Sequence, residues 1–319
     1  MLFKPLFLSL ILRSKNMAEV SEKGISYTGG FFMLIALAVG GMMIGGMLSI
    51  PVVMVMSGKS ITSVTDIMNN PAYFREMQVM QGISAIMGFL VPTIFSASLM
   101  SSKPLELTGF KGRATGRQIL ITVLIIACGL ALSSSLGYLS YQISFPKDWV
   151  ALFQKLENDY AKMAANLIRL NNGFELLVSI IVLALLPAVC EEALFRGGLQ
   201  NYLYRGTKKF WFSVIIVSLL FSIVHFSFYG FLSRFALGII LGLLYQYSGK
   251  LWLPIIAHFV NNATAVLVMY FQKADGKNIA DILNEKDGSY IGFLTIPLII
   301  FLFIKFRQIS VNDKTTNGI

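Results

Sequence analysis

Long apolar blocks that carry few or no charged side chains restrict most strongly how this chain can fold. Eight of them follow one another along the sequence, at approximately 30–56, 77–100, 118–142, 174–204, 210–229, 231–248, 251–271 and 290–306. A helix needs about 20 apolar residues to cross the roughly 30 Å of hydrocarbon in a bilayer. Backbone groups in lipid must bond within the chain, and no alternating barrel pattern is present, so helices are expected. We therefore predict an all-α, polytopic transmembrane bundle of about eight spans.

The composition agrees with a membrane protein and argues against nucleic-acid binding. Hydrophobic residues make up 55% of the 319 residues, and charged residues make up only 13%. The formal net charge of +10 is spread over the ends of apolar blocks and is not gathered in a basic patch. It therefore indicates membrane topology and no nucleic-acid partner. The two cysteines, Cys128 and Cys190, lie inside apolar blocks, which excludes a disulfide framework and a zinc-ribbon site.

The distribution of lysine and arginine predicts how the chain is oriented. With a cytoplasmic N-terminus, the segments around 101–117, 196–209 and 249–250 lie on the same side, which then holds 16 Lys and Arg residues against 10. This excess is the bias that the positive-inside rule describes. We predict a multi-pass protein of the bacterial inner membrane with both termini in the cytoplasm. The block at 231–248 is short, and a re-entrant segment there would reverse everything after it.

Two further patterns concern packing and the membrane surface. Residues 148–170 place apolar side chains on one face at helical spacing and polar side chains on the other, which predicts an interfacial amphipathic helix. This helix is either a lid or substrate-recruiting element, or a connector that lies on the membrane. Pairs of glycines four residues apart are typical of helices that pack closely. They are Gly40, Gly41, Gly45 and Gly46 in the first block, and Gly238 and Gly242 in the sixth.

Three charged residues, Glu191, Glu192 and Arg196, interrupt the interior of the fourth block. A charge at the centre of a membrane helix costs about 2.5–3.5 kcal/mol even on permissive scales, so such residues are interpreted first as functional. Glu192 and Arg196 are four residues apart and are expected to form an ion pair on one helix face. Glu191 points about 100° away from them. One carboxylate is therefore paired, and the other is free to act as a general base or acid.

The only two histidines of the chain also lie in apolar blocks. Phe221 and His225 are four residues apart and are predicted to share one helix face, as are His258 and Asn262. Counting residues from the turn near 206–207 places Glu191 and His225 at similar depth, within about 5 Å. The same counting from the turn near Gly249 places His258 at a shallower level.

Prolines offer a way to correct this mismatch in depth. Pro187 and Pro254 each lie four residues before a polar residue of interest, Glu191 and His258. A proline kinks a helix or begins one, and either effect changes the alignment of the residues that follow.

Three ordered motifs resemble those of a known family. The motifs E-E-x-x-x-R, F-x-x-x-H and H-x-x-x-N occur here as EEALFR (191–196), FSIVH (221–225) and HFVNN (258–262). They resemble the motifs of the CAAX-processing and bacteriocin-processing family of intramembrane proteases, and the resemblance covers about residues 174–271. It implies an eight-helix membrane fold with a polar cavity between four core helices, and hydrolysis of a peptide bond.

The same resemblance implies roles for six residues. Glu191 would be the base that activates water, with Glu192 and Arg196 beside it. His225 would complete the site, and His258 with Asn262 would hold the oxyanion. Peptide hydrolysis needs such a base and such donors. Alternatively, Glu191, His225 and His258 are the two histidines and one carboxylate of an open zinc site. No H-E-x-x-H motif favours a metal, and the cofactor, zinc or none, stays open.

The resemblance leaves the substrate open and divides the chain. A prenylated C-terminal CAAX peptide and a leader or membrane-anchored peptide both fit. We expect an N-terminal segment (1–30), transmembrane helices with the amphipathic helix (31–173), a protease-like core (174–271), and a last span with its tail (272–319). Residues 1–16 resemble a short anchor or lie upstream of a start at Met17. The tail from Ser310 is predicted to be disordered.

Two other functions use the same residues. A proton-coupled transporter would use the intramembrane acid, but it should show internal repeats or interrupted helices in matched halves. A non-catalytic immunity or scaffold protein on this fold should have lost some motif residue, whereas all of them are present here.

Overall fold

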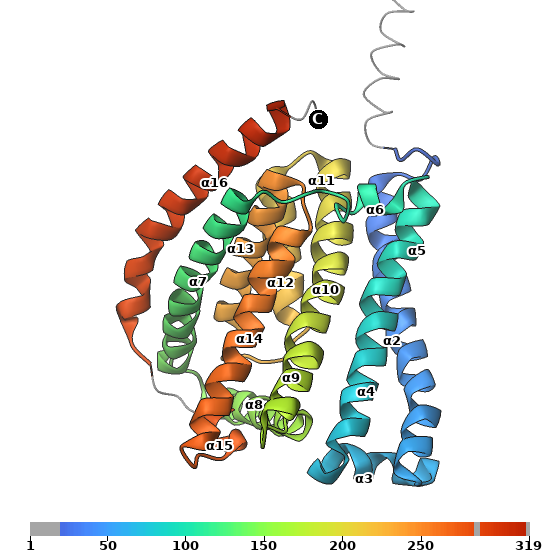
Figure 1. Ribbon diagram of the computed structural model, residues 1–319, viewed down its shortest axis with the longest axis vertical. Helices are drawn as coiled ribbons and strands as arrows, with labels where there is room; N and C mark the ends of the chain where they lie inside the picture. Colours follow the sequence, from blue (N-terminus) through green and yellow to red (C-terminus); the bar gives the residue numbers. More distant parts are fainter. Residues whose placement is uncertain (1–19, 284–287, 317–319) are drawn as a thin grey trace, which may run out of the picture.

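The computed structural model describes residues 20–283 and 288–316, and helices packed side by side make up this part of the chain (Figure 1). Within it the one strand-like feature is a single antiparallel β-bridge between Val20 and Ser26. The predicted all-α bundle is therefore confirmed. The predicted N-terminal anchor and the alternative start at Met17 lie outside the described residues.

Helices dominate from Tyr27 onward, with short irregular turns between them. The α-helices are α2 (Tyr27–Ser57), α3 (Val64–Asn69), α4 (Phe74–Ala85), α5 (Val91–Met100), α6 (Pro104–Leu107), α7 (Gly116–Gln142), α8 (Lys147–Leu167), α9 (Gly173–Ile180), α10 (Leu186–Glu192), α11 (Asn201–Thr207), α12 (Phe210–Ile223), α13 (Phe231–Ser248), α14 (Trp252–Ala274), α15 (Ile279–Leu283) and α16 (Ile296–Thr316). Short 3₁₀ helices occupy Ile61–Ser63, Pro71–Tyr73 and Tyr290–Thr295. Wider π-helical turns occupy Ile86–Leu90, Ile181–Leu185 and Ala193–Gln200.

Seven helical stretches in the described part of the chain are long and apolar enough to cross a membrane. They are Tyr27–Ser57, Pro71–Met100, Gly116–Gln142, Gly173–Thr207, Phe231–Ser248, Trp252–Ala274 and Tyr290–Asp313. Each matches one predicted span. The predicted fifth span, 210–229, is wrong in length because α12 ends at Ile223 after 14 residues. The sixth, α13, is one continuous helix of 18 residues and does not reverse as a re-entrant segment would.

Prolines stand where the helices change their pitch or begin. Pro92 and Pro187 are each the second residue of a helix that directly follows a π-helical turn. A proline removes one hydrogen bond and its ring crowds the carbonyl four residues earlier, so the helix must widen or bend there. Pro254 lies in the first turn of α14, where its missing N–H needs no partner. The predicted effects of Pro187 and Pro254 agree with this arrangement.

The helices surround a central group that includes α10, α12, α13 and α14 (Figure 1). Helices α2, α4 and α5 stand at one side of it, and α7 and α16 stand at the other. Helix α8 runs across the end of the bundle opposite to the C-terminus. The core of the bundle contains fully buried apolar residues from these groups: Leu34, Ile125, Ile126, Val214, Val217, Leu241 and Leu244.

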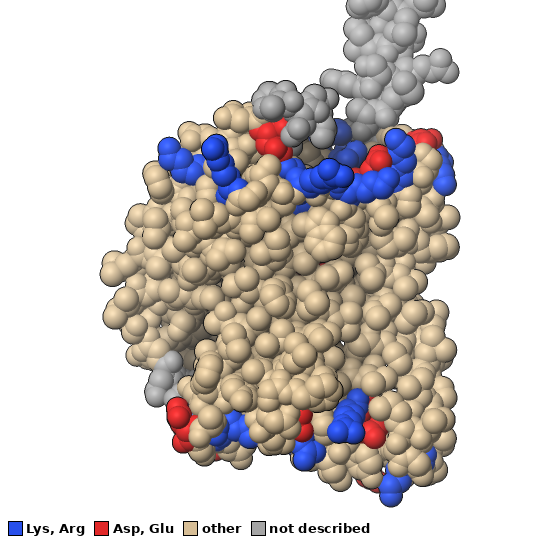
Figure 2. Space-filling model, viewed as in Figure 1, with Lys and Arg blue, Asp and Glu red and all other residues tan. Residues whose placement is uncertain are grey.

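The outer surface has the distribution that a bilayer demands. Figure 2 shows Lys, Arg, Asp and Glu side chains at the two ends of the molecule, with a broad belt free of them between. Large apolar side chains are exposed on the helices of this belt, as for Phe32, Met47 and Ile300. Such exposure is costly in water and natural in lipid. This chain is therefore an integral membrane protein.

The predicted disorder of the tail from Ser310 is wrong as far as residue 316. Helix α16 continues to Thr316, and the buried hydroxyl of Ser310 accepts a hydrogen bond from Nε2 of Gln118 at 3.1 Å. One turn further, Asp313 forms an ion pair with Lys250, and Lys250 also donates to Gln118. These tertiary contacts fix a polar sequence that looks disordered when read alone.

Glycines of α2 allow the close approach of the neighbouring helix, but only on one face. A side chain at Gly41 would overlap the backbone carbonyl oxygen of Met87, and one at Gly45 would lie 3.2 Å from Cα of Ser84. Nothing lies within 4 Å of such a side chain at Gly40 or Gly46. The packing role predicted for the glycine pairs is thus confined to Gly41 and Gly45 in this helix.

This difference gives a matched test. Gly41→Ala is expected to lower the free energy of unfolding by about 1–3 kcal/mol, because the new methyl group forces two backbones apart. Gly40→Ala adds the same methyl group to open space and should leave stability unchanged or slightly higher. Thermal unfolding of both variants in the same detergent checks this. Equal midpoints for the two variants would show that the contact at Gly41 is not tight.

Candidate active site

A cavity of about 570 Å³ opens among α8, α10, α13, α14 and the turn after α12. Glu191, His225, His258 and Asn262 all line it. Four of the six predicted site residues, which come from three separate helical segments, are thus brought together. The other two, Glu192 and Arg196, lie behind the wall of the cavity and are fully buried.

Glu192 is the centre of a buried polar network. Its Oε1 accepts a hydrogen bond from Nη1 of Arg196 at 2.9 Å, and Nδ1 of His258 lies 2.8 Å from the same oxygen. Nη2 of Arg196 donates to the carbonyl oxygen of Gly238 at 3.2 Å. A side chain at Gly238 would crowd Ser218, so the glycine allows α13 to come close. The predicted Glu192–Arg196 ion pair is present, and it holds the His258 ring.

His258 lies at the depth of Glu191 and not at the shallower level predicted. The reason is the position of the turn before α14, which lies outside the three motifs. The turn before α14 does not lie at the surface of the bundle: Leu251 is fully buried, its N–H donates to Gly109, and the indole of Trp252 donates to Phe110. The segment around α6 therefore covers this turn.

The buried turn sets the register of α14. A side chain at Gly197 would lie 3.4 Å from Cδ2 of Leu251, so these two residues are level. His258 follows Leu251 by seven residues and Glu191 precedes Gly197 by six, which brings them to the same depth.

Glu191 faces the cavity beside His258. Its Oε2 lies 4.0 Å from Nε2 of His258, and the carboxylate side chain is 16% exposed. This Oε2 has no hydrogen-bond partner among the described residues. Because Glu192 is engaged by Arg196 and His258, the two adjacent carboxylates differ in the way the sequence predicts. Oε2 of Glu192 is enclosed without a partner as well, so the difference is that Oε1 of Glu192 is paired, whereas only Glu191 lines the cavity.

His225 lies beyond the end of α12, not on its face as predicted. The helix ends at Ile223, and the next residue after the histidine, Phe226, has φ +50°. Nδ1 of His225 lies 2.7 Å from the carbonyl oxygen of Phe221. A carbonyl only accepts, so this nitrogen carries the hydrogen, and Nε2 is left as the nitrogen with a free lone pair.

Phe221 holds the two histidines apart and in place. Its ring centroid lies 5.0 Å from that of His225 and 5.8 Å from that of His258, both in edge-to-face arrangements. The guanidinium of Arg196 lies over the same ring at 4.6 Å, a favourable cation–π distance. The phenylalanine of the second motif is therefore a packing residue of the site.

Asn261 and Arg234 are among the polar residues of the cavity that the sequence analysis does not single out. Nδ2 of Asn261 donates to Oδ1 of Asn262 at 3.0 Å, which leaves the NH₂ group of Asn262 to face other partners. Arg234 lines the cavity from α13. Signals for both exist in the sequence: Asn261 is adjacent to a motif residue, and Arg234 is a charged residue inside an apolar block.

The positions of the candidate ligand atoms show whether Glu191, His225 and His258 fit a zinc site. Across the described ranges no group of three or more His, Cys, Asp or Glu side chains is placed to hold a metal ion. Oε2 of Glu191 and Nε2 of His258 are 4.0 Å apart, whereas two ligands of a tetrahedral zinc at about 2.0–2.1 Å are roughly 3.3 Å apart. The residues do not form a zinc site in this arrangement, and no step below is assigned to a metal.

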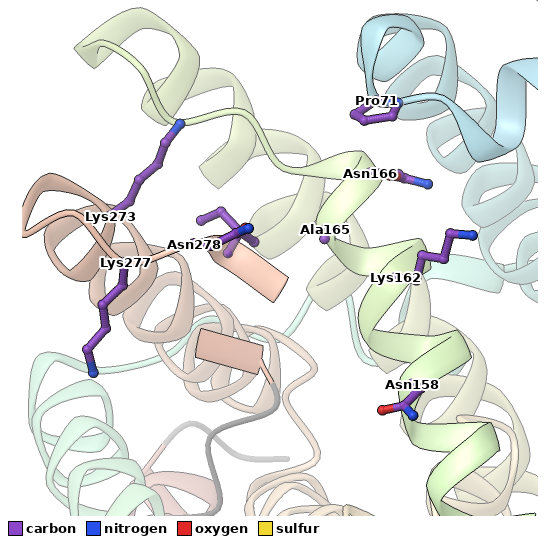
Figure 3. A pocket seen from close by; sticks show the side chains of 9 residues that line it. Pro71, Asn158, Lys162, Ala165, Asn166, Lys273, Lys277 and Asn278 are labelled. Carbon is purple, nitrogen blue, oxygen red and sulfur yellow. The ribbon is translucent and has the colours of Figure 1, made fainter. Parts of the chain in front are cut away.

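A second hollow of about 560 Å³ lies where α8 meets the segment from Lys273 to Ile279. Three lysines line it, but Figure 3 shows that Lys162, Lys273 and Lys277 extend to different sides. Nζ of Lys273 donates to Asn171 at 2.7 Å. Because its polar groups do not converge, this hollow is a weaker candidate than the cavity with Glu191.

Comparisons with known proteins cover the part of the chain that contains the motifs. Residues 173–264 match the family model described as type II CAAX prenyl endopeptidase Rce1-like. Two proteins of Bacillus subtilis are similar: "Uncharacterized protein YpbD" is 35% identical over 97 residues (29% of this chain, 47% of YpbD), and "Putative membrane peptidase YdiL" is 34% identical over 89 residues (28% of this chain, 36% of YdiL).

The chain thus spans less than half the length of each of these relatives. No solved structure gives a significant match. The similarity that the three motifs predict is confirmed for the segment that contains them: residues 173–264 carry the sequence pattern of the Rce1-like, CAAX-processing family of membrane peptidases.

Proposed function

We propose that this protein is an intramembrane endopeptidase that hydrolyses a peptide bond of a membrane-associated substrate, with water activated by Glu191. The observation that carries the proposal is the position of Glu191. It is a carboxylate without a hydrogen-bond partner on Oε2, it lies 4.0 Å from His258, and it faces a cavity inside an apolar bundle. Intramembrane carboxylates are expensive, and one that faces a polar cavity is a candidate catalyst.

The first step would be attack by water on the substrate carbonyl. One water molecule can bridge two groups that are 4.0 Å apart, as Oε2 of Glu191 and Nε2 of His258 are. Glu191 takes one proton from this water while the oxygen attacks the carbonyl carbon. The carbonyl oxygen becomes an oxyanion. The NH₂ group of Asn262, whose oxygen is held by Asn261, is available to donate to it.

The second step would break the peptide bond. Glu191 returns its proton to the amide nitrogen, which leaves as an amine, and the former water oxygen stays in the new carboxyl group. Glu192 and Arg196 act through His258, because they fix the orientation of its ring without facing the cavity. The ring of His225 packs on Phe221, as the ring of His258 does. We assign to Nε2 of His225 a contact with substrate or water.

The lining of the cavity suits a peptide with apolar side chains. Apart from the polar residues it contains Met163, Leu167, Leu183, Val266 and Met269. Tyr160 and the first two of these belong to α8, so the amphipathic helix covers the cavity with its apolar face. We therefore favour the lid or recruiting role for α8 over that of a plain connector. The substrate class includes a lipidated C-terminal peptide and a leader or membrane-anchored peptide.

The positive-inside bias supports cytoplasmic termini in a bacterial inner membrane. Helix α8 lies at the opposite end of the bundle from the C-terminus (Figure 1). In this orientation the cavity would lie nearer to the outer face of the membrane, where substrates would approach.

Comparison of membrane peptides tests the proposed function. Cells that produce the wild type, Glu191→Gln or Glu106→Gln are compared by mass spectrometry of their peptide fragments. Glu106 is an exposed carboxylate of α6 that pairs with Lys103 and Lys111, so it controls for the loss of one negative charge. We expect fragments that occur with the wild type and Glu106→Gln but are lost with Glu191→Gln. Identical fragments in all three would favour the transporter or scaffold alternatives.

The asparagine pair gives a graded prediction. Asn262→Ala removes the proposed oxyanion donor and should lower the turnover number by about 10²–10³-fold. Asn261→Ala only frees the Asn262 amide to rotate, so a smaller loss of about tenfold is expected. Initial rates on one substrate, measured in parallel with the KM of each variant, distinguish the two effects. A larger loss for Asn261→Ala than for Asn262→Ala would exchange their roles.

A further inference from the structure

Arg234 is a cation inside the cavity that the proposed reaction does not use. It is the fourth residue of α13, and the side chain lines the cavity that also contains Glu191 and His225. Its Nη1 is enclosed and has no hydrogen-bond partner in the described part of the chain. An arginine guanidinium has five N–H donors and no acceptor. An enclosed donor of this kind needs an acceptor, and an anion is the strongest acceptor for a guanidinium.

The neighbours of Arg234 hold the guanidinium without neutralising it. The ring of Tyr160 on α8 lies 5.0 Å from Cζ of Arg234. The guanidinium also lies against Gly230, where a Cβ atom would overlap Nη1. The glycine therefore leaves the space that the guanidinium occupies, and the tyrosine covers it.

Two acidic residues, Glu157 and Glu191, lie near Arg234, and neither forms an ion pair with it. No acidic side chain among the described residues comes within ion-pair distance of it, although such pairs occur for Arg196 and Lys250. Oε2 of Glu157 instead accepts a hydrogen bond from Ser227, in the turn after α12, at 2.8 Å. Glu191 lies in the same cavity and leaves its own Oε2 without a partner. The cavity thus presents one free cation and one free carboxylate at separate points of its wall.

We propose that Arg234 binds a carboxylate of the substrate and so selects peptides that carry one near the bond to be cut. This inference rests on the proposed function and names the substrate class of that site. The planar fork of a guanidinium matches a carboxylate with two parallel hydrogen bonds. The carboxylate is either the free C-terminus of the peptide or the side chain of an Asp or Glu. Both have the same chemistry, so only experiment separates them.

Binding of lipopeptide libraries tests the proposal without a known substrate. Three libraries of N-palmitoylated hexapeptides are used. The first has free C-termini and no acidic side chains, the second has amidated C-termini and no acidic side chains, and the third has amidated C-termini and one Asp or Glu. Each is incubated with the protein in nanodiscs, and the bound peptides are quantified by mass spectrometry after subtraction of binding to empty nanodiscs.

The expected result is a preference of about tenfold or more for the first or the third library over the second, in the range of charge-assisted hydrogen bonds. The preferred library identifies the source of the carboxylate. Arg234→Gln should lose this preference, and Arg234→Lys, which keeps the charge without the fork, should retain part of it. Arg75→Gln is the matched control, because Arg75 is an exposed arginine that also stacks on an aromatic ring, that of Phe74 at 5.6 Å. It should bind as the wild type does.

The same samples separate this proposal from the proposed function. Equal binding of all three libraries by the wild type would overturn the role of Arg234, even if Arg234→Gln fails to fold. A preference that survives in a folded Arg234→Gln protein would overturn it too. Cleavage that depends on Glu191 without any carboxylate preference would leave the peptidase proposal in place. A carboxylate preference without cleavage would support the binding site and contradict the peptidase.

Discussion

Replacing Glu191 by glutamine is expected to lower the rate of peptide cleavage by about 10²–10⁴-fold, the usual contribution of a general base. Glutamine has nearly the same shape and cannot accept the proton of the attacking water. The protein should remain folded, because Oε2 of Glu191 makes no hydrogen bond in the described structure and the side chain faces a cavity. The substitution thus removes a chemical group without removing a structural contact.

Initial rates of purified protein in nanodiscs, on a peptide identified by the fragment comparison, measure this effect. Glu191→Asp keeps the acid but withdraws it by one methylene group, so an intermediate rate is expected. The thermal unfolding midpoint of each variant serves as the control for folding. A folded Glu191→Gln protein that keeps near-normal turnover would show that another group activates the water.

Replacing Arg196 by methionine is expected to have the largest effect on stability, a loss of about 3–5 kcal/mol in the free energy of unfolding. Arg196 and Glu192 are 1% and 0% exposed, and the pair is bonded at 2.9 Å. Removal of the guanidinium leaves the Glu192 carboxylate buried without its cation, and it also frees the carbonyl oxygen of Gly238. Activity should fall as well, because Glu192, which holds the His258 ring, is no longer fixed by Arg196.

The double variant Glu192→Gln with Arg196→Met separates charge from packing. It buries no unpaired charge, so most of the lost stability should return, while activity should stay low because Glu192 no longer holds Nδ1 of His258 as a carboxylate. Unfolding of the wild type, the single variants and the double variant under the same conditions gives the coupling energy. A double variant no more stable than Arg196→Met alone would mean that the ion pair is not the reason for the loss.

Local spacing was sufficient to predict one part of the site. The Glu192–Arg196 pair follows from a separation of four residues in a helix, and the separate direction of Glu191 follows from the next position. The apolar blocks likewise predict the long helices, because the bilayer restricts their length and leaves few alternatives. These features depend on residues that are close in the sequence.

Features that depend on distant segments were not predictable in this way. The depth of His258 is set by Leu251, which is buried under the segment around Gly109. The π-helical turn Ala193–Gln200, which contains Arg196, has no recognised signal in the sequence. Nor does the sequence show that α12 ends before His225, since no proline or glycine follows the helix before Gly230.

Arg234 and Asn261 were missed for a different reason. Both are easily found in the sequence: Arg234 lies inside a short apolar block, and Asn261 lies beside a motif residue. Their importance appears only when the cavity is seen, because Nη1 of Arg234 has no hydrogen-bond partner among the described residues and Asn261 orients Asn262. The rule that an ionisable residue within a membrane span is a functional candidate would have selected Arg234.

The most direct measurement of peptide hydrolysis by Glu191 uses labelled water. Membranes that contain the wild type or Glu191→Gln are incubated in H₂¹⁸O, and newly formed C-termini are identified by mass spectrometry from the incorporated ¹⁸O. We expect a set of labelled C-termini that forms with the wild type and is lost with Glu191→Gln, because the attacking oxygen comes from water and needs this base. The same labelled C-termini in equal amounts from both membranes would contradict a Glu191-dependent peptidase.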